Sequence, residues 1–91
     1  MEIRLILYDN ESLKMKRSVV KRIIGRAKNK FNVAVAEIEE QDALDRATLG
    51  CVMVANDKRY LRSQLDKLEN FVVAMGLADV EQAPKLIEQY S

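Results

Sequence analysis

A run of lysines and arginines between residues 14 and 28 is the part of this sequence whose residue types point most directly to a chemical role. No aspartate or glutamate occurs between Ser12 and Ala36. Positive side chains along one element neutralise phosphates and release their counterions, which is the electrostatic basis of nucleic-acid binding. We therefore expect RNA phosphates to be contacted by Lys14, Lys16, Arg17, Lys21, Arg22, Arg26 and Lys28.

The composition favours a single folded domain spanning residues 1–91. Hydrophobic residues make up 48% of the chain and charged residues 32%, whereas a disordered chain would contain far fewer Val, Ile and Leu.

The net charge of +1 hides an uneven distribution of charge along the sequence. Residues 1–30 carry nine lysines and arginines against three acids, and residues 31–91 carry six against eleven. The positive charge is therefore concentrated in the first third of the chain.

Several classes of chemistry have little support in the sequence. Histidine is absent and Cys51 is the only cysteine, so zinc ligation, imidazole catalysis and an intramolecular disulfide are not expected. No glycine lies between Tyr8 and Ser12, where a phosphate-binding loop would require it. We predict no catalytic residue, metal or cofactor, although Arg46 and Asn56-Asp57 could line a substrate pocket. The lack of a signal segment or long apolar run predicts a cytoplasmic protein.

The hydrophobic periodicity predicts six elements in the order β-α-β-β-α-β. Alternating residues from Ile3 to Leu7 predict a strand, and a 3.6-residue period after Ser12 predicts a helix over residues 12–30 that ends at Asn29-Lys30-Phe31-Asn32, with asparagine in the left-handed conformation. Strands are expected at 31–40 and 47–55, the latter central and buried on both faces. A second helix follows Asn56-Asp57 and stops at Gly76. Residues 77–90 fit either a strand or a short helix.

This order predicts an α+β, ferredoxin-like two-layer sandwich, in which two helices cover one face of a four-stranded antiparallel sheet. Pro84 lacks an N–H, so a last strand must be an edge strand or end near that residue. The second sheet face would carry apolar residues with no helix over them, either Val33 and Val35 or Ala34, Ala36 and Ile38. Such a face favours a homodimer.

Three stretches carry a resemblance to a known family. They are SLKMKRSVVK at 12–21, FNVAVAE at 31–37 and QDALDRATLGCVMVAND at 41–57. Over residues 1 to about 75 the sequence resembles the YlxP-like bacterial proteins, also called domain of unknown function 503, which share S-L-K-x-K-R, F-N-V and R-A-x-L-G with a later N-D. The resemblance implies a ferredoxin-like fold and no established catalytic residue. It also implies gene neighbourhoods of translation initiation and small-subunit maturation, and so an RNA or ribosomal partner.

The placement of the cations favours function over a plain solvated helix face. Lys14, Lys16 and Arg17 would lie in or just after the opening turn, where the helix dipole disfavours cations by roughly 0.3 to 1 kcal/mol each. No acid within the helix compensates them, although acids elsewhere in the fold could. We interpret the chain as a non-enzymatic RNA- or ribosome-binding factor. The alternative is a homo-oligomeric scaffold or sensor that uses the open sheet face.

Two further charged groups permit weaker interpretations. Lys58, Arg59 and Arg62 could extend the basic surface or only flank it. An acidic group near the second hairpin offers oxygen ligands for a weak Mg²⁺ or Ca²⁺ site, but its spacing matches no EF-hand, and a solvated hairpin tip is the simpler reading. The same acids could instead repel RNA or dock a basic ribosomal protein. They are Glu37, Glu39, Glu40, Asp42 and Asp45.

Overall fold

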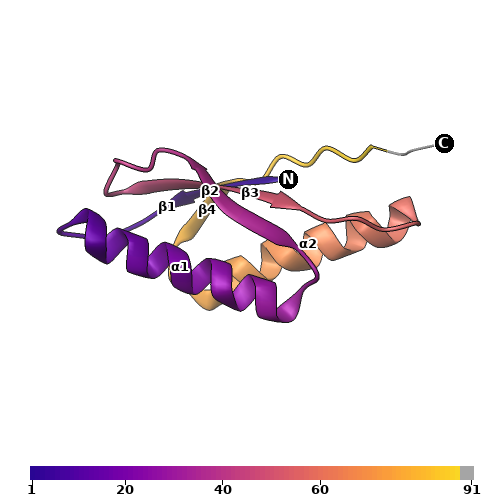
Figure 1. Cartoon of the computed structure of the whole chain (residues 1–91), viewed down its shortest axis with the longest axis horizontal. Helices are drawn as coiled ribbons and strands as arrows, with labels where there is room; N and C mark the ends of the chain where they lie inside the picture. Colours follow the sequence, from indigo (N-terminus) through magenta and orange to yellow (C-terminus); the bar gives the residue numbers. More distant parts are fainter. Residues whose placement is uncertain (89–91) are drawn as a thin grey trace.

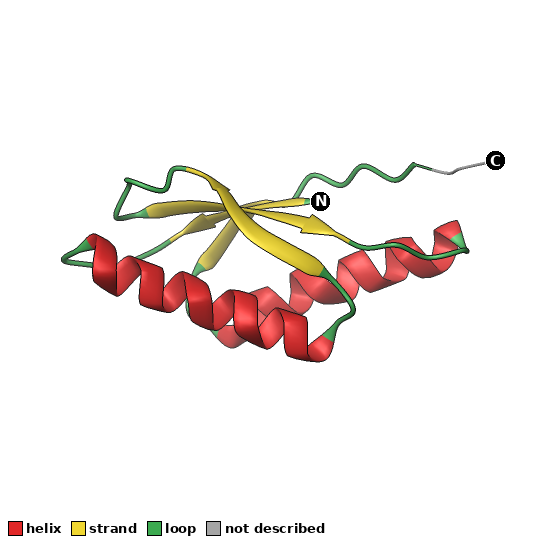
Figure 2. Cartoon of the chain, in the orientation of Figure 1, coloured by secondary structure: helices red, strands yellow, loops and turns green. Residues whose placement is uncertain are grey.

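Four strands and two helices alternate in the predicted order β-α-β-β-α-β in a computed structural model, which describes residues 1–88. The elements are β1 (Glu2–Ile6), α1 (Leu13–Lys30), β2 (Ala34–Glu39), β3 (Arg46–Val52), α2 (Lys58–Met75) and β4 (Asp79–Gln82). The strands form one antiparallel sheet in the order β2-β3-β1-β4, and both helices lie on the same face of it (Figures 1 and 2). This is the ferredoxin-like α+β fold.

The core lies between the sheet and the two helices. Ile3 pairs with Leu49 and Leu5 pairs with Ala47, so β1 and β3 direct their apolar side chains to the helix-covered face. These four residues are at most 1% exposed. From the helices, the core receives Val20, Ile23, Ala27, Leu68 and Val72, all buried. Burying such side chains contributes about 1.5 to 3 kcal/mol each and fixes both helices against the sheet.

The ends of the elements follow the predicted signals in most places. Ser12 and Asp57 are the N-caps of α1 and α2, and Gly76 ends α2 with a φ of 69°. The predicted end of α1 is wrong in its mechanism, because the capping residue is Phe31 in an extended conformation. Neither Asn29 nor Asn32 has a positive φ. The aromatic ring explains this choice, since Phe31 packs edge-on against Phe71 of α2 with 5.7 Å between the ring centroids.

The last segment is a short edge strand followed by an irregular stretch. β4 pairs only with β1, as the proline required, and ends two residues before Pro84. The Glu2 backbone N–H donates to the Pro84 carbonyl (3.1 Å), so Pro84 accepts a hydrogen bond where it cannot donate one. Beyond it, Lys85 pairs with Asp66 and Glu69 of α2. Of the stretch predicted to end at Tyr90, residues 89 and 90 lie outside the described part.

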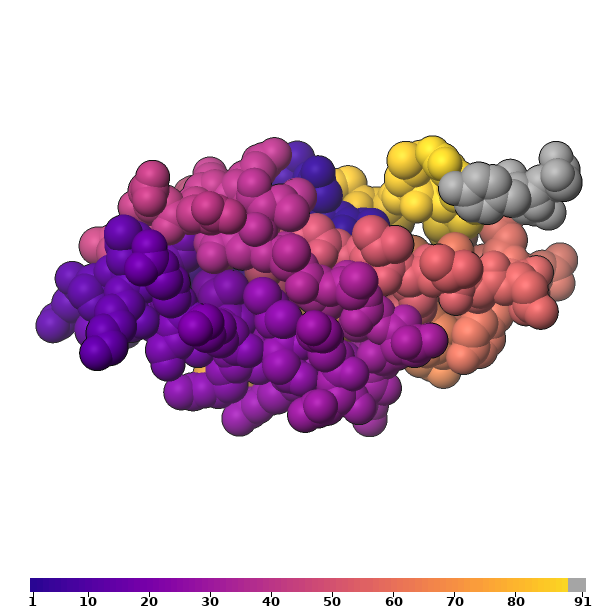
Figure 3. Space-filling model, viewed as in Figure 1, coloured from indigo at the N-terminus to yellow at the C-terminus, as the bar shows by residue number. Residues whose placement is uncertain are grey.

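The molecule is elongated, with extents of 47 × 21 × 19 Å. In Figure 1, α1 begins at the left, beside the hairpin that joins β2 to β3, and α2 begins at the far right. The N-termini of the two helices therefore lie at opposite ends of the long axis. In the space-filling view, α1 forms much of the lower left surface (Figure 3). None of the helices within residues 1–88 is long and apolar enough to cross a membrane.

Candidate nucleic-acid interface

The first helix is held so that most of its cations face solvent. The Met15 backbone N–H donates to Ser12 Oγ (3.2 Å), which caps the helix as the sequence predicted. Val20, Ile23 and Ala27 form its buried stripe and are at most 3% exposed. Lysines and arginines therefore occupy both flanks and the outer surface of α1. The exposed ones from the predicted set are Lys14, Arg17, Lys21, Arg22, Arg26 and Lys28.

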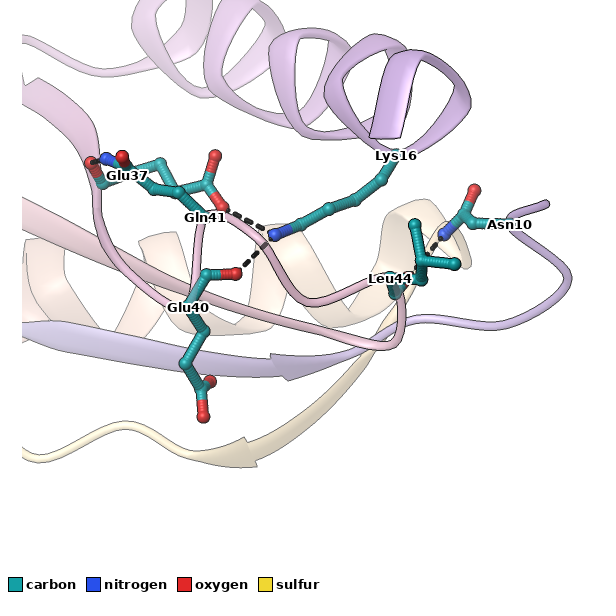
Figure 4. A network of polar contacts seen from close by, with 6 residues as sticks. All are labelled: Asn10, Lys16, Glu37, Glu40, Gln41 and Leu44. Atoms are coloured by element: carbon teal, nitrogen blue, oxygen red, sulfur yellow. Dashed lines mark hydrogen bonds and ion pairs between the residues drawn. The ribbon is translucent and has the colours of Figure 1, made fainter. Parts of the chain in front are cut away.

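Lys16 is the exception, and its predicted contact with phosphate is wrong in this structure. Its side chain is fully buried, and its Nζ lies 2.8 Å from Glu37 Oε2 (Figure 4). The same ammonium donates a 2.6 Å hydrogen bond to the Glu40 carbonyl. A buried ammonium requires such a partner, because an unpaired charge away from water is strongly disfavoured. Lys16 is therefore an internal anchor.

The spacing of residues could have revealed this anchor. Lys16 precedes Val20 by four residues, and Val20 precedes Ile23 and Ala27 by three and seven, so Lys16 continues the buried stripe by one turn. The sequence interpretation grouped Lys16 with the phosphate-contacting cations, because a lysine is rarely fully buried unless a partner neutralises it. Its partner Glu37 is also visible in the sequence pattern. Glu37 lies two residues after Val35, and β2 turns alternate residues towards the helices.

The anchor fixes the hairpin between β2 and β3 beside the start of α1. Glu40 adopts a positive φ of 61°, which is uncommon for a residue other than glycine, and its carbonyl is the acceptor for Lys16. Asn10 Nδ2 donates to the Leu44 carbonyl (3.2 Å), and the Leu7 N–H donates to the Asp45 carbonyl (2.9 Å). The acidic residues of the hairpin therefore lie at the same end of the molecule as the first turn of α1.

The remaining cations of α1 have no acidic partner in the part of the chain that the structure describes. Within residues 1–88, no Asp or Glu oxygen lies within 4.0 Å of the charged nitrogens of Lys14, Arg17, Lys21, Arg22, Arg26 or Lys28. The sequence left open that acids from other elements compensate these cations, and within the described residues such an ion pair forms with Lys16 alone. Lys30, in the last turn of α1, has its Nζ 5.8 Å from the centre of the Phe71 ring. The first helix thus presents a basic surface whose cations form no ion pair within residues 1–88.

The cations of α2 form a separate group. Lys58, Arg59 and Arg62 surround a hollow of about 450 Å³ together with Asn56 and Asp57. This hollow lies at the start of α2, at the opposite end of the long axis from the start of α1 (Figure 1). These residues therefore do not extend the basic surface around Lys14 and Arg17. Asp57 caps the helix by accepting from the Arg59 N–H (3.0 Å), which accounts for it structurally.

The open face of the sheet combines an apolar half with a charged half. Ala34 pairs with Val52 and Ala36 with Gly50, and Ile38 lies over Gly50, so this half is apolar. Val52 is 65% exposed, which shows that the predicted burial of β3 on both faces is wrong at this residue. The charged half surrounds a hollow of about 300 Å³ above the buried Thr48. Its charged lining residues are Arg4, Glu39, Glu40, Arg46 and Glu81.

Ion pairing accounts for Arg46, the residue on this face that the sequence suggested for a substrate pocket. Arg46 pairs with Glu81 across the sheet, and the hydrogen bond to that carboxylate raises the pKa of the guanidinium. The Tyr8 hydroxyl donates to Asp79 (2.8 Å), and this hydrogen bond raises the pKa of the phenol.

No group of three or more acidic or thiol side chains among residues 1–88 is placed to hold a metal ion.

Cys51 is buried on the helix side of β3, as the apolar strand suggested. Burial raises the pKa of its thiol to about 11, so the thiolate that a nucleophile requires is scarce at neutral pH. The thiol packs in the core and is 3% exposed. Cys51 is therefore explained as a small core side chain.

Comparison with known proteins confirms the family that the sequence resembles. The profile of a family described as "Protein of unknown function (DUF503)" matches residues 1–84. The chain belongs to this family. A DUF503 relative, "Uncharacterized protein YlxP" of Bacillus subtilis (strain 168), is 39% identical over 71 residues, which cover 78% of this chain and 77% of the relative. The matched range, residues 1–84, includes the whole of α1 and the hairpin between β2 and β3.

Proposed function

We propose that this protein is a cytoplasmic, non-enzymatic factor that binds structured ribosomal RNA through the exposed cations of α1, in translation or small-subunit maturation. The observation that carries the proposal is the set of six exposed cations with no acidic partner within residues 1–88. The set is that of the sequence interpretation without Lys16. We call it the α1 basic surface: Lys14, Arg17, Lys21, Arg22, Arg26 and Lys28.

The arrangement is unfavourable for the isolated chain and favourable for a polyanion. Lys14 and Arg17 lie near the N-terminus of α1, where the helix dipole disfavours positive charge by about 0.3 to 1 kcal/mol each. The first turn contains no acid that would relieve this cost. A phosphate backbone would attract these cations, and counterions would be released when it bound. Positive charge that is costly in the free protein therefore supports a nucleic-acid role.

The sheet favours recognition of backbone shape over reading of single-stranded bases. RNA-binding sheets that read single strands use exposed aromatic residues on their central strands to stack the bases. Here the open-face residues of the central strands β1 and β3 include Arg4, Arg46, Thr48 and Gly50, and no aromatic residue. Tyr8, just after β1, is hydrogen-bonded to Asp79. Phosphate contacts on a folded RNA therefore suit this chain better than base stacking.

Charge reversal on α1 tests the proposal. The variant carries Lys14→Glu, Arg17→Glu and Lys21→Glu, and the matched control carries the same change in charge on α2 as Lys58→Glu, Arg59→Glu and Arg62→Glu. We expect the wild type and the control to sediment with purified ribosomal subunits and the α1 variant to remain in the supernatant. The salt dependence of binding should also flatten in the α1 variant, by about one unit of slope for each phosphate that is no longer neutralised.

Circular dichroism establishes that each variant is folded before its binding is interpreted. Retention of the α1 variant on subunits, with its helical signal intact, would contradict the proposal. Equal loss of binding in both variants would mean that net charge, and not the α1 surface, governs binding.

A second copy of the chain is a further candidate partner, on the open sheet face. The apolar half of that face includes Ile38 and Val52, which are 45% and 65% exposed. The charged half carries both signs, so two copies related by a two-fold axis can oppose Arg4 or Arg46 to Glu39 or Glu81. Sedimentation equilibrium should show a concentration-dependent dimer that Val52→Lys dissociates. A wild type that stays monomeric at about 100 times the concentration of the RNA assay would exclude this dimer.

A further inference from the structure

Gly25 is the one glycine of this chain that the fold does not explain. At Gly76 the φ of 69° favours glycine, and at Gly50 an added Cβ would lie 3.0 Å from Ile38 Cγ2. Gly25 lies in the middle of α1 with ordinary helical geometry, and an added Cβ would meet nothing within 4 Å. A glycine inside a helix is less favourable than alanine by roughly 0.5 to 1 kcal/mol. Gly25 therefore lowers the stability of the free protein, and no contact within residues 1–88 requires a glycine there.

The surroundings of Gly25 suggest what occupies the open space. At about 100° per residue, Lys21 and Lys28 lie some 40 to 60° to one side of Gly25, and Arg22 and Arg26 lie some 60 to 100° to the other. All four side chains are exposed, and none pairs with an acid within residues 1–88. Gly25 is therefore the lowest point between two rows of cations that run along the outer surface of α1.

We propose that α1 lies in the minor groove of an RNA duplex, with Gly25 facing the groove floor and each row of cations contacting one phosphate strand. This inference rests on the proposed RNA binding and names the structure that is bound. The minor groove of A-form RNA is wide and shallow and displays 2′-hydroxyls, so a helix can approach its floor. The minor groove of B-form DNA, about 6 Å wide, is too narrow for a helix about 10 Å across.

A side chain at residue 25 would hold the helix away from the floor and would weaken the contacts of both rows. Gly25→Gln adds a neutral side chain that is a good helix former, so it tests the space without changing the charge. Gly25→Ala is the smaller version of the same change. Ser63→Gln, at an exposed position on α2, is the matched control. The probes are a blunt RNA duplex of about 20 base pairs, the DNA duplex of the same sequence and one of the RNA strands.

We expect Gly25→Gln and Gly25→Ala to raise the Tm by a few degrees, because both residues favour the helix more than glycine does. Gly25→Gln should nevertheless weaken binding to the RNA duplex at least tenfold, Gly25→Ala should weaken it less, and Ser63→Gln should bind as the wild type does. The wild type should prefer the RNA duplex to the DNA duplex and to the single strand by a similar factor.

The outcomes separate this inference from the function on which it rests. Unchanged affinity in Gly25→Gln, or equal wild-type affinity for the three probes, would overturn the groove geometry. Phosphate binding through the α1 basic surface would still stand in that case, provided that the charge-reversed α1 variant no longer binds. A wild type that binds neither the duplex nor ribosomal subunits would overturn both.

Discussion

Replacing Lys16 by methionine should destabilise the fold far more than the same change at an exposed lysine. Methionine keeps most of the aliphatic length but removes the ammonium, which is fully buried in the wild type. Glu37, whose side chain is only 15% exposed, would lose the positive charge 2.8 Å from its Oε2. The Glu40 carbonyl would lose the donor that now lies 2.6 Å away. Glu37 would therefore remain as a largely buried carboxylate without its cation, whereas the Glu40 carbonyl would keep the hydrogen bond from the Ala43 N–H (3.1 Å).

The size of the effect follows from these interactions. Breaking a buried ion pair by removing one partner costs about 3 to 5 kcal/mol. Because Glu37 is partly exposed, we expect a cost at or just below the lower end of that range, at about 2 to 3 kcal/mol. For a domain of this length, each kcal/mol corresponds to a fall in Tm of about 4 to 8 °C. Lys16→Met should therefore lower the Tm by about 10 to 20 °C. A chain of this size is stable by roughly 5 to 14 kcal/mol, so the variant should still fold.

Urea unfolding of five proteins measures this effect and its origin. They are the wild type, Lys16→Met, Glu37→Leu, the double variant and, as the exposed control, Lys21→Met. Lys21→Met should stay within about 0.5 kcal/mol of the wild type. The double variant should recover to within about 1 kcal/mol, because it buries no unpaired charge. A Lys16→Met protein as stable as Lys21→Met, or a double variant whose loss of stability equals the sum of the single losses, would refute the anchor.

Four further outcomes are expected. Ser12→Ala removes the acceptor for the Met15 N–H and should lower the free energy of unfolding by about 0.5 to 2 kcal/mol in urea, whereas Ser18→Ala on the exposed face should not. The pKa of Cys51 is raised to about 11 from an ordinary 9.0, so folding favours the neutral thiol. The free energy of unfolding should therefore fall between about pH 9 and pH 11. The pH dependence measured for Cys51→Ala should lack that part of the fall. At pH 8 the folded thiol should react with a disulfide reagent about 100-fold more slowly than the unfolded one, judged from the thiolate fraction alone. Arg22→Gln with Arg26→Gln should weaken binding to the RNA duplex more than Lys14→Gln with Arg17→Gln does, and filter binding at several salt concentrations measures both.

The fold was accessible from the sequence because local and long-range signals agree. Ile3, Leu5 and Leu7 alternate as a half-covered strand requires, and the leucines of α2 repeat at helical spacing. Right-handed connections then leave few ways to arrange two β-α-β units in one sheet. Pro84 independently indicated that the last strand either lies at an edge or ends near that residue, and β4 does both. These signals depend on residue type and spacing alone.

The parts that were not predicted depend on side chains meeting across the fold. The end of α1 is set by the packing of Phe31 on Phe71, which are forty residues apart and give no local signal. The burial of Lys16 requires both the helical stripe on α1 and the inward position of Glu37 on β2. A charge in a buried stripe is usually excluded by its cost, and only the partner removes that cost. The exposure of Val52 likewise depends on the absence of a second layer over β3 within the described residues.

The anchor also decides which part of the α1 basic surface attracts phosphate most strongly. By holding the hairpin beside the first turn of α1, Lys16 brings the acids Glu39, Glu40, Asp42 and Asp45 to the end where Lys14 and Arg17 lie. The negative potential of these acids reduces the positive potential of the two cations over roughly one Debye length, which is about 8 Å at physiological salt. The second half of α1 extends away from the hairpin, so Arg22, Arg26 and Lys28 keep more of their potential. That half also contains Gly25, and the strongest attraction therefore coincides with the point where a groove can approach α1 most closely.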